Sequence, residues 1–162
     1  MDGHYKIRKA SKEDAETILF FINRLADYEK LSDKVNATTD LLIKYGFSDR
    51  PFFEALIAKD EQDAPLGLAL YFFTFSTFLA KPTLYLEDLF VLPEYRGLGI
   101  GKSFFRELVG IAQDCGCGRM EWSVLDWNSP SIEFYKALGA EPVSGWTTYR
   151  LDQQALASFD SI

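Results

Sequence analysis

A glycine-rich segment near the middle of the chain has the residue types and spacing that bind phosphate groups. Arg96, Gly99 and Gly101 form the pattern R-x-x-G-x-G between an apolar stretch and residues at helical spacing. Backbone N–H groups at the start of a helix lie at the positive end of its dipole, where phosphate oxygens bind. Two other phosphate-binding patterns fail, because Lys102 replaces a glycine of the dinucleotide pattern and Arg96 replaces one of the NTPase pattern. On this loop alone, a turn without a ligand is the alternative.

Two adjacent carboxylates, Glu87 and Asp88, interrupt the apolar stretch that precedes the loop. A charge inside a sheet is costly unless it is paired or takes part in a reaction, so we interpret Glu87 as a candidate general base. In a regular strand the two side chains lie on opposite faces, whereas a β-bulge brings both near one site. The alternative is an exposed strand end with two solvated acids.

Two further segments carry candidate functional groups. Asn128 opens the segment 128–139, which also contains Tyr135. A tyrosine is protonated at neutral pH and can act as a general acid, although helical periodicity alone favours a core aromatic here. Asp27-Tyr28-Glu29 places two acids at a predicted helix end, where the helix dipole disfavours anions. This end is either a solvated surface or a patch that receives a cation.

The elements that must position these residues alternate between strands and helices along the chain. Strands are expected at residues 4–8, 52–59, 66–75, 85–92, 120–125 and 146–151. Helices are expected from a Ser11–Asp14 capping box to about Tyr28, at 40–45, from Ile100 to about Gly116, and from Asn128 to Gly139. The third helix has an apolar stripe, formed by Ile100, Phe104, Leu108, Val109 and Ala112. This order predicts one mixed α/β domain over residues 1–162.

Composition narrows the class of partner. The chain has 162 residues, 48% of them apolar, and a net charge of −7. The apolar content predicts a folded domain. The negative net charge makes nucleic acid an unexpected partner. It is compatible with a cationic small substrate, but it is also an ordinary way for a protein to stay in solution. Without a membrane-length apolar run or a signal-peptide pattern, we expect a cytoplasmic protein. Cys115, Cys117 and the single histidine predict no metal centre and no structural disulfide.

The loop at 96–101 and the segment 128–139 together resemble the cofactor-binding motifs of the GNAT family of N-acetyltransferases. The similarity runs from Ile7 to Leu151 and is strongest to the diamine and thialysine acetyltransferase branch, through Tyr85-Leu86-Glu87-Asp88 and Asp126-Trp127-Asn128. It implies a mixed, mostly antiparallel central sheet that is flanked by helices and splayed between the strand of Glu87 and the next strand. Ser76 departs from the polyamine enzymes, which carry an acid at that position.

The resemblance implies transfer of an acetyl group from acetyl-CoA to the primary amine of a small cationic substrate, either a thialysine-like amino acid, a diamine or a polyamine. Attack is direct, with Glu87 as base and Tyr135 as the acid that protonates the departing thiolate. A protein or peptide N-acetyltransferase and a non-catalytic acetyl-CoA sensor are the alternatives.

The same resemblance assigns binding residues and a partner. The substrate amine is received by Tyr28, Glu29, Glu87 and Asp88. Acetyl-CoA is bound, in part through backbone N–H groups, by Phe90, Val91, Leu92, Arg96, Gly97, Leu98, Gly99, Ile100, Gly101, Lys102, Ser103, Asn128 and Tyr135. A homodimer is expected, with residues 146–151 at or across its interface.

Overall fold

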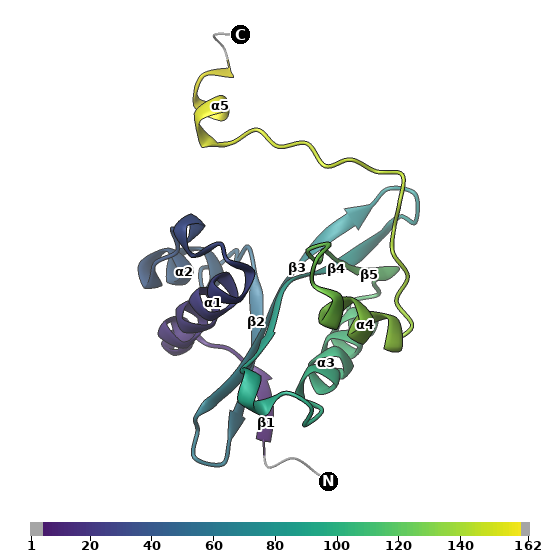
Figure 1. Ribbon diagram of the computed structural model, residues 1–162. Helices are drawn as coiled ribbons and strands as arrows, with labels where there is room; N and C mark the ends of the chain where they lie inside the picture. The colour runs from purple at the N-terminus through teal and green to yellow at the C-terminus, as the bar shows by residue number, and fades with distance from the viewer. Residues whose placement is uncertain (1–4, 160–162) are drawn as a thin grey trace. The chain divides into compact units, whose positions relative to one another are not determined.

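The computed structural model describes residues 5–159, and its central feature is a five-stranded sheet in the order β1-β2-β3-β4-β5 (Figure 1). The strands are β1 (Tyr5–Lys9), β2 (Glu54–Asp60), β3 (Pro65–Ser76), β4 (Lys81–Val91) and β5 (Arg119–Trp122). The first four pair antiparallel, and β5 runs parallel to β4. The mixed, mostly antiparallel sheet predicted from the sequence is therefore confirmed. His4, predicted in the first strand, lies outside the described residues.

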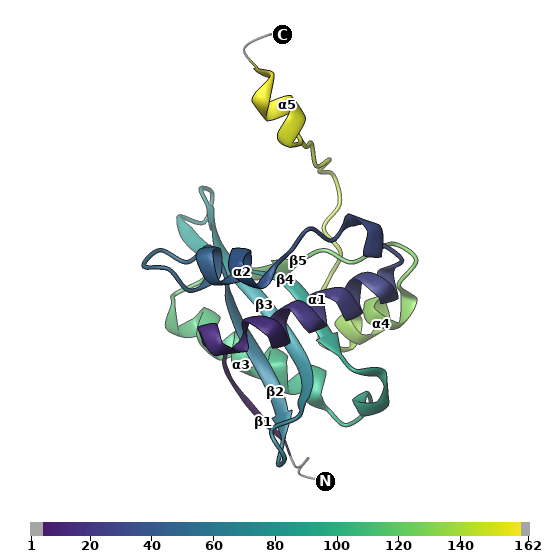
Figure 2. The ribbon, with the colours of Figure 1, turned by 90° about the vertical axis from the view of Figure 1, so that its left-hand side faces the viewer.

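Helices cover both faces of this sheet. α1 (Ala15–Glu29) and α2 (Thr39–Gly46) lie over one face, and α3 (Ile100–Asp114) lies over the other (Figures 1 and 2). The predicted capping box is present: the backbone N–H of Ser11 donates to Asp14 at 2.9 Å, in a 3₁₀ turn that leads into α1. Both edges of the predicted helices agree with the structure to within about two residues.

The apolar stripes of the helices form the core. Ile18 and Phe21 of α1 are fully buried against β-strand residues that include Ile57, Leu68 and Phe90. Burial of each such side chain contributes about 1.5–3 kcal/mol. On the other face, α3 buries four of its five predicted stripe residues. The exception is Val109, which is 42% exposed, whereas Phe105, which was not predicted in the stripe, is buried and contacts Trp122.

The chain divides into two compact units, Met1–Ser123 and Val124–Ile162. The first contains the sheet and α1–α3, and the second contains α4 (Ser129–Ala137) and α5 (Gln153–Ala157). Asn128 caps α4 as predicted, its side-chain oxygen accepting the Ser131 N–H at 3.4 Å. The organisation of residues 1–162 as one domain stays a prediction.

The strand predicted at residues 146–151 is wrong. The structure has no regular element there, and α5 follows it. Alternating apolar residues produce a strand only when a neighbouring strand accepts and donates the ladder hydrogen bonds. Trp146, Tyr149 and Leu151 are exposed, and these residues pair with no strand of this chain within the described range. The strand predicted at 120–125 is present but shorter, because β5 ends at Trp122.

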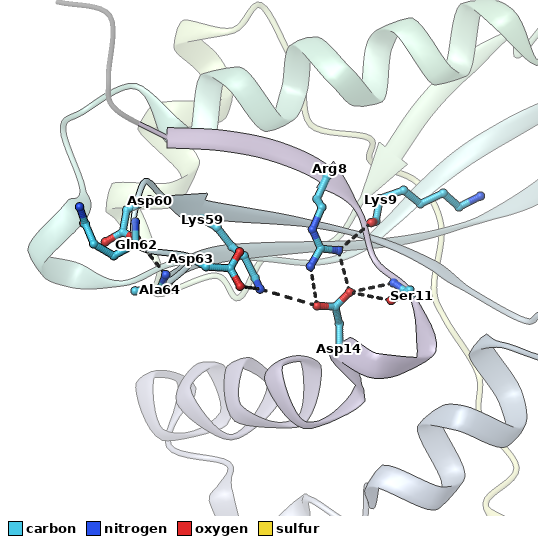
Figure 3. A network of polar contacts seen from close by, with 9 residues as sticks. All are labelled: Arg8, Lys9, Ser11, Asp14, Lys59, Asp60, Gln62, Asp63 and Ala64. Atoms are coloured by element: carbon cyan, nitrogen blue, oxygen red, sulfur yellow. Dashed lines mark hydrogen bonds and ion pairs between the residues drawn. The ribbon is translucent and has the colours of Figure 1, made fainter.

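A buried carboxylate fastens β1 to the start of α1. Both oxygens of Asp14 accept hydrogen bonds at 2.7 Å from the guanidinium of Arg8 (Figure 3). Lys59 of β2 lies 4.0 Å from the same carboxylate and also pairs with Asp63. The Arg8 hydrogen bonds are the main reason that the pKa of Asp14 falls from its ordinary value of 3.8 to about 2. This network connects the edge strand β1 to the turn that begins α1 and to β2.

The depressed pKa of Asp14 predicts an acid-dependent contribution to stability. The contribution is complete above the unfolded-state pKa near 4 and is lost as pH falls through the folded-state value of about 2. Asp14→Asn should therefore lower the free energy of unfolding by about 1–2 kcal/mol at pH 7, allowing for the partly exposed Arg8. Urea titrations between pH 2 and pH 7 should show the difference shrinking below pH 4. Asp63→Asn, which removes an exposed partner of Lys59, is the control and should change stability by less than about 0.5 kcal/mol.

Candidate functional site

A β-bulge at Glu87 sets the geometry of the candidate site. Leu86 pairs with Tyr71 and Asp88 pairs with Leu70, so Glu87 is the extra residue of β4. Residues directly opposite each other share a face of the sheet. Leu70 belongs to the core beneath α1, and Asp88 therefore faces α1 too. The bulge considered from the sequence is present, and it turns the second carboxylate toward the helix.

Asp88 and Glu29 line one pocket of about 250 Å³. Its remaining walls come from the second half of α1 and from the segment that follows this helix: Ile22, Leu25, Ala26, Leu31, Lys34, Val35, Asn36 and Ala37. Glu29 and Asp88, two of the predicted substrate-binding residues, are thus brought together. Glu87 is exposed on the bulge. Its role as a base stays a prediction.

The surroundings of Asp88 favour its protonated form far more than water does. Burial, followed by repulsion from Glu87 and Glu29, raises the pKa of Asp88 from 3.8 to about 7. Burial also raises the pKa of Glu29. Glu29 and Asp88 line the cavity and repel each other, and Glu87 outside it adds to the repulsion on Asp88. A cation that entered would relieve that repulsion and favour ionised Asp88.

The sheet opens along β4 next to this pocket. Pairing between β4 and β5 ends at Leu86 and Trp122, while pairing with β3 continues to Val91. The Leu92 N–H donates to the Leu66 carbonyl oxygen at 3.0 Å, on the β3 side. Because N–H directions alternate along a strand, the Phe90 N–H also faces β3 and the Val91 N–H faces the open edge. Of the three residues predicted to supply a backbone donor, Val91 is the one placed to do so.

The glycine-rich loop has the backbone conformation of an anion-binding turn. Gly97 and Gly99 have positive φ values of 78° and 84°, and Gly99 is the N-cap of α3. The first intrahelical hydrogen bond of α3 joins the Ser103 N–H to the Gly99 carbonyl oxygen at 2.9 Å. The N–H groups of residues 100–102 precede it at the positive end of the helix dipole. Ser103 is itself tied to β1 by a 2.8 Å hydrogen bond with the Tyr5 hydroxyl.

Arg96 anchors this loop to the sheet and to α1. Its Nε–H donates to the Val91 carbonyl oxygen at 3.0 Å. Its guanidinium carbon lies 5.0 Å from the centre of the Tyr28 ring and 5.4 Å from that of Phe90, within cation–π range. Of the two roles considered for Arg96, phosphate contact or loop anchor, these contacts favour the anchor. Tyr28 contributes to this stack, and its predicted contact with substrate stays a prediction.

Two of the predicted residues lie in the second unit, and one part of the pocket was not predicted. Asn128 caps α4, and Tyr135 lies in that helix with its ring centre 5.5 Å from that of Phe134.

The segment Leu31–Ala37 lines the pocket but carries no sequence motif that marks it as functional. The polar side chains of Lys34 and Asn36, a few residues after two acids at a helix end, are the one feature of the sequence that could have marked this segment as part of a binding site.

Residues 5–159 contain no group of three or more His, Cys, Asp or Glu side chains that could hold a metal ion. No helix in that range combines the length and the apolar character needed to cross a membrane.

The repulsion between Glu87 and Asp88 predicts a change in titration. Glu87→Gln should lower the pKa of Asp88 below the wild-type value of about 7, because it removes the larger of the two charge repulsions. Carboxyl carbon-13 chemical shifts followed from pH 4 to pH 9 would report the pKa directly. Glu107→Gln on the exposed side of α3 is the matched control and should leave it unchanged. An unaltered Asp88 titration in Glu87→Gln would contradict this electrostatic account.

Replacement of Gly99 by alanine and replacement of Gly110 by alanine should change the stability of the protein in opposite directions. Gly99→Ala forces a side chain into a left-handed conformation and should lower the free energy of unfolding by about 1 kcal/mol. Gly110 lies inside α3 with open space around it, so Gly110→Ala should raise stability by about 0.5–1 kcal/mol. Thermal or urea unfolding of the two variants measures both effects. Equal effects would show that the loop conformation imposes no constraint.

Comparison with known proteins agrees with this architecture. Residues 19–140 match the Acetyltransferase (GNAT) family. A thialysine N-epsilon-acetyltransferase of Bos taurus is 39% identical over 93% of this chain and 94% of its own length. The spermidine/spermine N(1)-acetyltransferase-like protein 1 of Homo sapiens is 36% identical over 94% of this chain and 23% of that longer protein. An integron cassette protein of V. cholerae has a TM-score of 0.80 at 27% identity, covering 99% of both chains. The chain is therefore an acetyltransferase and belongs to the GNAT family.

Proposed function

We propose that this acetyltransferase moves the acetyl group of acetyl-CoA to the primary amine of a small cationic substrate by direct attack. One observation carries the proposal: the acidic pocket and the open edge belong to the same strand. Asp88 lines the pocket and Val91 lies at the open edge, three residues further along β4. At about 3.3 Å per residue they are about 10 Å apart, which suits two substrates that meet at β4.

The amine is bound by the carboxylates of the pocket. Asp88 and Glu29 offer negative charge inside a small cavity, where a cation is attracted more strongly than at an exposed surface. The thialysine and spermidine/spermine names of the relatives support amines as the substrate class. The net charge of −7 adds a favourable long-range field for cations.

Acetyl-CoA fits the loop and the open edge, and family membership implies its use. Its thioester supplies the acetyl group. The N–H groups of residues 100–102 are the donors for its pyrophosphate, and the absence of a side chain at Gly97, Gly99 and Gly101 allows close approach. The Val91 N–H is the donor for the thioester carbonyl oxygen. Asn128 adds a contact to the pantetheine arm besides capping α4.

Proton transfer is assigned to Glu87 and Tyr135. An alkyl ammonium has a pKa of about 10.4 and must lose its proton before it attacks, so a carboxylate at the amine is needed. Glu87, exposed on the bulge beside the pocket residue Asp88, takes that proton directly or through water. A tyrosine hydroxyl is normally protonated at neutral pH, and Tyr135 donates its proton to the leaving sulfur.

A homodimer completes the proposed enzyme. Trp146, Tyr149 and Leu151 expose a large apolar surface in the segment that was predicted as a strand. A second copy of the chain would supply the missing neighbour. Light scattering at several protein concentrations reports the assembly.

The proposed chemistry predicts which amines react and which variants fail. Free thiol release should be fast with small primary amines and slow with a basic peptide. Tyr135→Phe and Glu87→Gln should each lower kcat by about 100-fold, because each removes one proton-transfer group. Tyr45→Phe in α2 and Glu107→Gln in α3, both at exposed residues, are the matched controls and should keep wild-type rates.

Each contrary outcome would point to a different function or mechanism. A Tyr135→Phe variant with full turnover would remove the tyrosine from the mechanism. Faster reaction with the basic peptide would favour a protein or peptide N-acetyltransferase. Binding of acetyl-CoA without turnover of any amine would favour the sensor.

A further inference from the structure

The pocket that contains Asp88 has negative charge at one end and a positive charge at the other. Asp88, partly buried on β4, and Glu29, at the end of α1, form an anionic region. Apolar side chains such as Ile22 and Leu25 line its wall. The segment after α1 contributes a cation, Lys34, which is exposed and therefore lies at the rim. A ligand that matches this lining has an ammonium group, an aliphatic stem and, at the rim, an anionic group.

Lys34 is held in place by its backbone and remains free to reorient its ammonium group. The side-chain amide of Asn36 donates to the Lys34 carbonyl oxygen at 3.1 Å, which fixes the turn. The Lys34 ammonium pairs with the adjacent Asp33 at 3.1 Å, and the two side chains are 73% and 70% exposed. Exposed pairs of this kind contribute little, so a carboxylate of a ligand can compete for Lys34 at small cost.

The size of the pocket limits the occupant. Its volume of about 250 Å³ is below the range of about 300–1,000 Å³ that is typical of pockets for drug-sized ligands. A short molecule fits with both ends in contact with protein, whereas a long polyamine would extend past the rim. A second ammonium group there would meet Lys34, a like charge.

Ser76, where the sequence departs from the polyamine enzymes, lies outside this pocket. Its hydroxyl oxygen accepts a hydrogen bond from the Leu79 N–H at 3.3 Å. The residue is buried at the end of β3 that pairs with Lys81. Asp88 lies seven residues further along β4 than Lys81, which is about 23 Å in an extended strand. The choice of amine at the pocket therefore depends on the pocket's own lining and not on Ser76.

From these observations we propose that Lys34 selects amino acids that carry a terminal amine over diamines and polyamines, by binding the substrate carboxylate at the rim of the pocket. The terminal ammonium group lies at Asp88 and Glu29, the aliphatic stem lies along the apolar wall, and the carboxylate pairs with Lys34. Asn36 offers an amide oxygen to the substrate's α-ammonium group. This specificity rests on the proposed function, because it assumes that the pocket receives the amine.

A matched pair of amines tests the role of Lys34. Thialysine and bis(2-aminoethyl) sulfide have the same chain length and differ only by the carboxylate. Acetylation of both is measured by thiol release, and binding of both is measured by calorimetry, for the wild type, Lys34→Gln and Lys34→Glu. Lys30→Gln is the control, since Lys30 is a nearby exposed lysine outside the pocket lining and its loss changes the net charge equally.

The expected results separate charge selection from a general effect. The wild type should favour thialysine in both KM and Kd. Lys34→Gln should raise the KM for thialysine about fivefold and leave the diamine within twofold. Lys34→Glu should reverse the preference, because its carboxylate pairs with the second ammonium group of the diamine. Lys30→Gln should behave as the wild type does.

The outcomes that overturn the inference differ from those that overturn the proposed function. Equal use of the two amines by the wild type, with no change in Lys34→Gln, would overturn the role of Lys34 while amine acetylation stands. Tighter binding of thialysine through Lys34 without turnover would support the role of Lys34 and contradict only the catalytic proposal. Failure to bind or acetylate either amine would overturn both.

Discussion

The extra residue of β4 determines how the first unit is built. Before Glu87, alternate β4 side chains such as Leu84 and Leu86 are buried in the sheet beside β5. After Glu87, Asp88 and Phe90 lie beneath α1. A regular strand would have kept Asp88 on the face of Leu86, since side chains two apart share a face. One unpaired residue therefore moves a carboxylate from one layer of the protein to the other. It also marks the point beyond which β5 no longer pairs with β4.

A second link joins the substrate pocket to the glycine-rich loop. Tyr28 precedes the pocket residue Glu29 in α1, and its ring stacks on both Phe90 and the Arg96 guanidinium. Arg96 in turn precedes Gly97 and holds the Val91 carbonyl oxygen. The end of α1, the end of β4 and the start of the loop are thus held by one set of contacts. Contacts within the chain therefore join the three elements that border the pocket and the loop.

Local sequence signals predicted the parts of the fold that local physics controls. The capping box at Ser11–Asp14, the glycine-rich loop before α3 and the apolar stripe of α3 are each determined by residues within one or two turns. The position of the bulge was not predictable from periodicity, because it depends on the register of β4 against β3. The error at 146–151 has the same origin, since a strand requires a partner that its own residues do not specify. Among the pocket residues, Lys34 was not predicted, because its place in the lining arises from the approach of the segment after α1 to β4.

The raised pKa of Asp88 has a thermodynamic consequence. A carboxyl group with a pKa raised to about 7 holds its proton in a sizeable fraction of molecules in neutral solution. Any cation that occupies the cavity displaces that fraction into the medium. The heat of association would then contain a buffer ionisation contribution, which differs between phosphate and Tris. Calorimetric enthalpies gathered in a single buffer would mix ligand contacts with proton release, and a comparison across buffers would count the protons expelled.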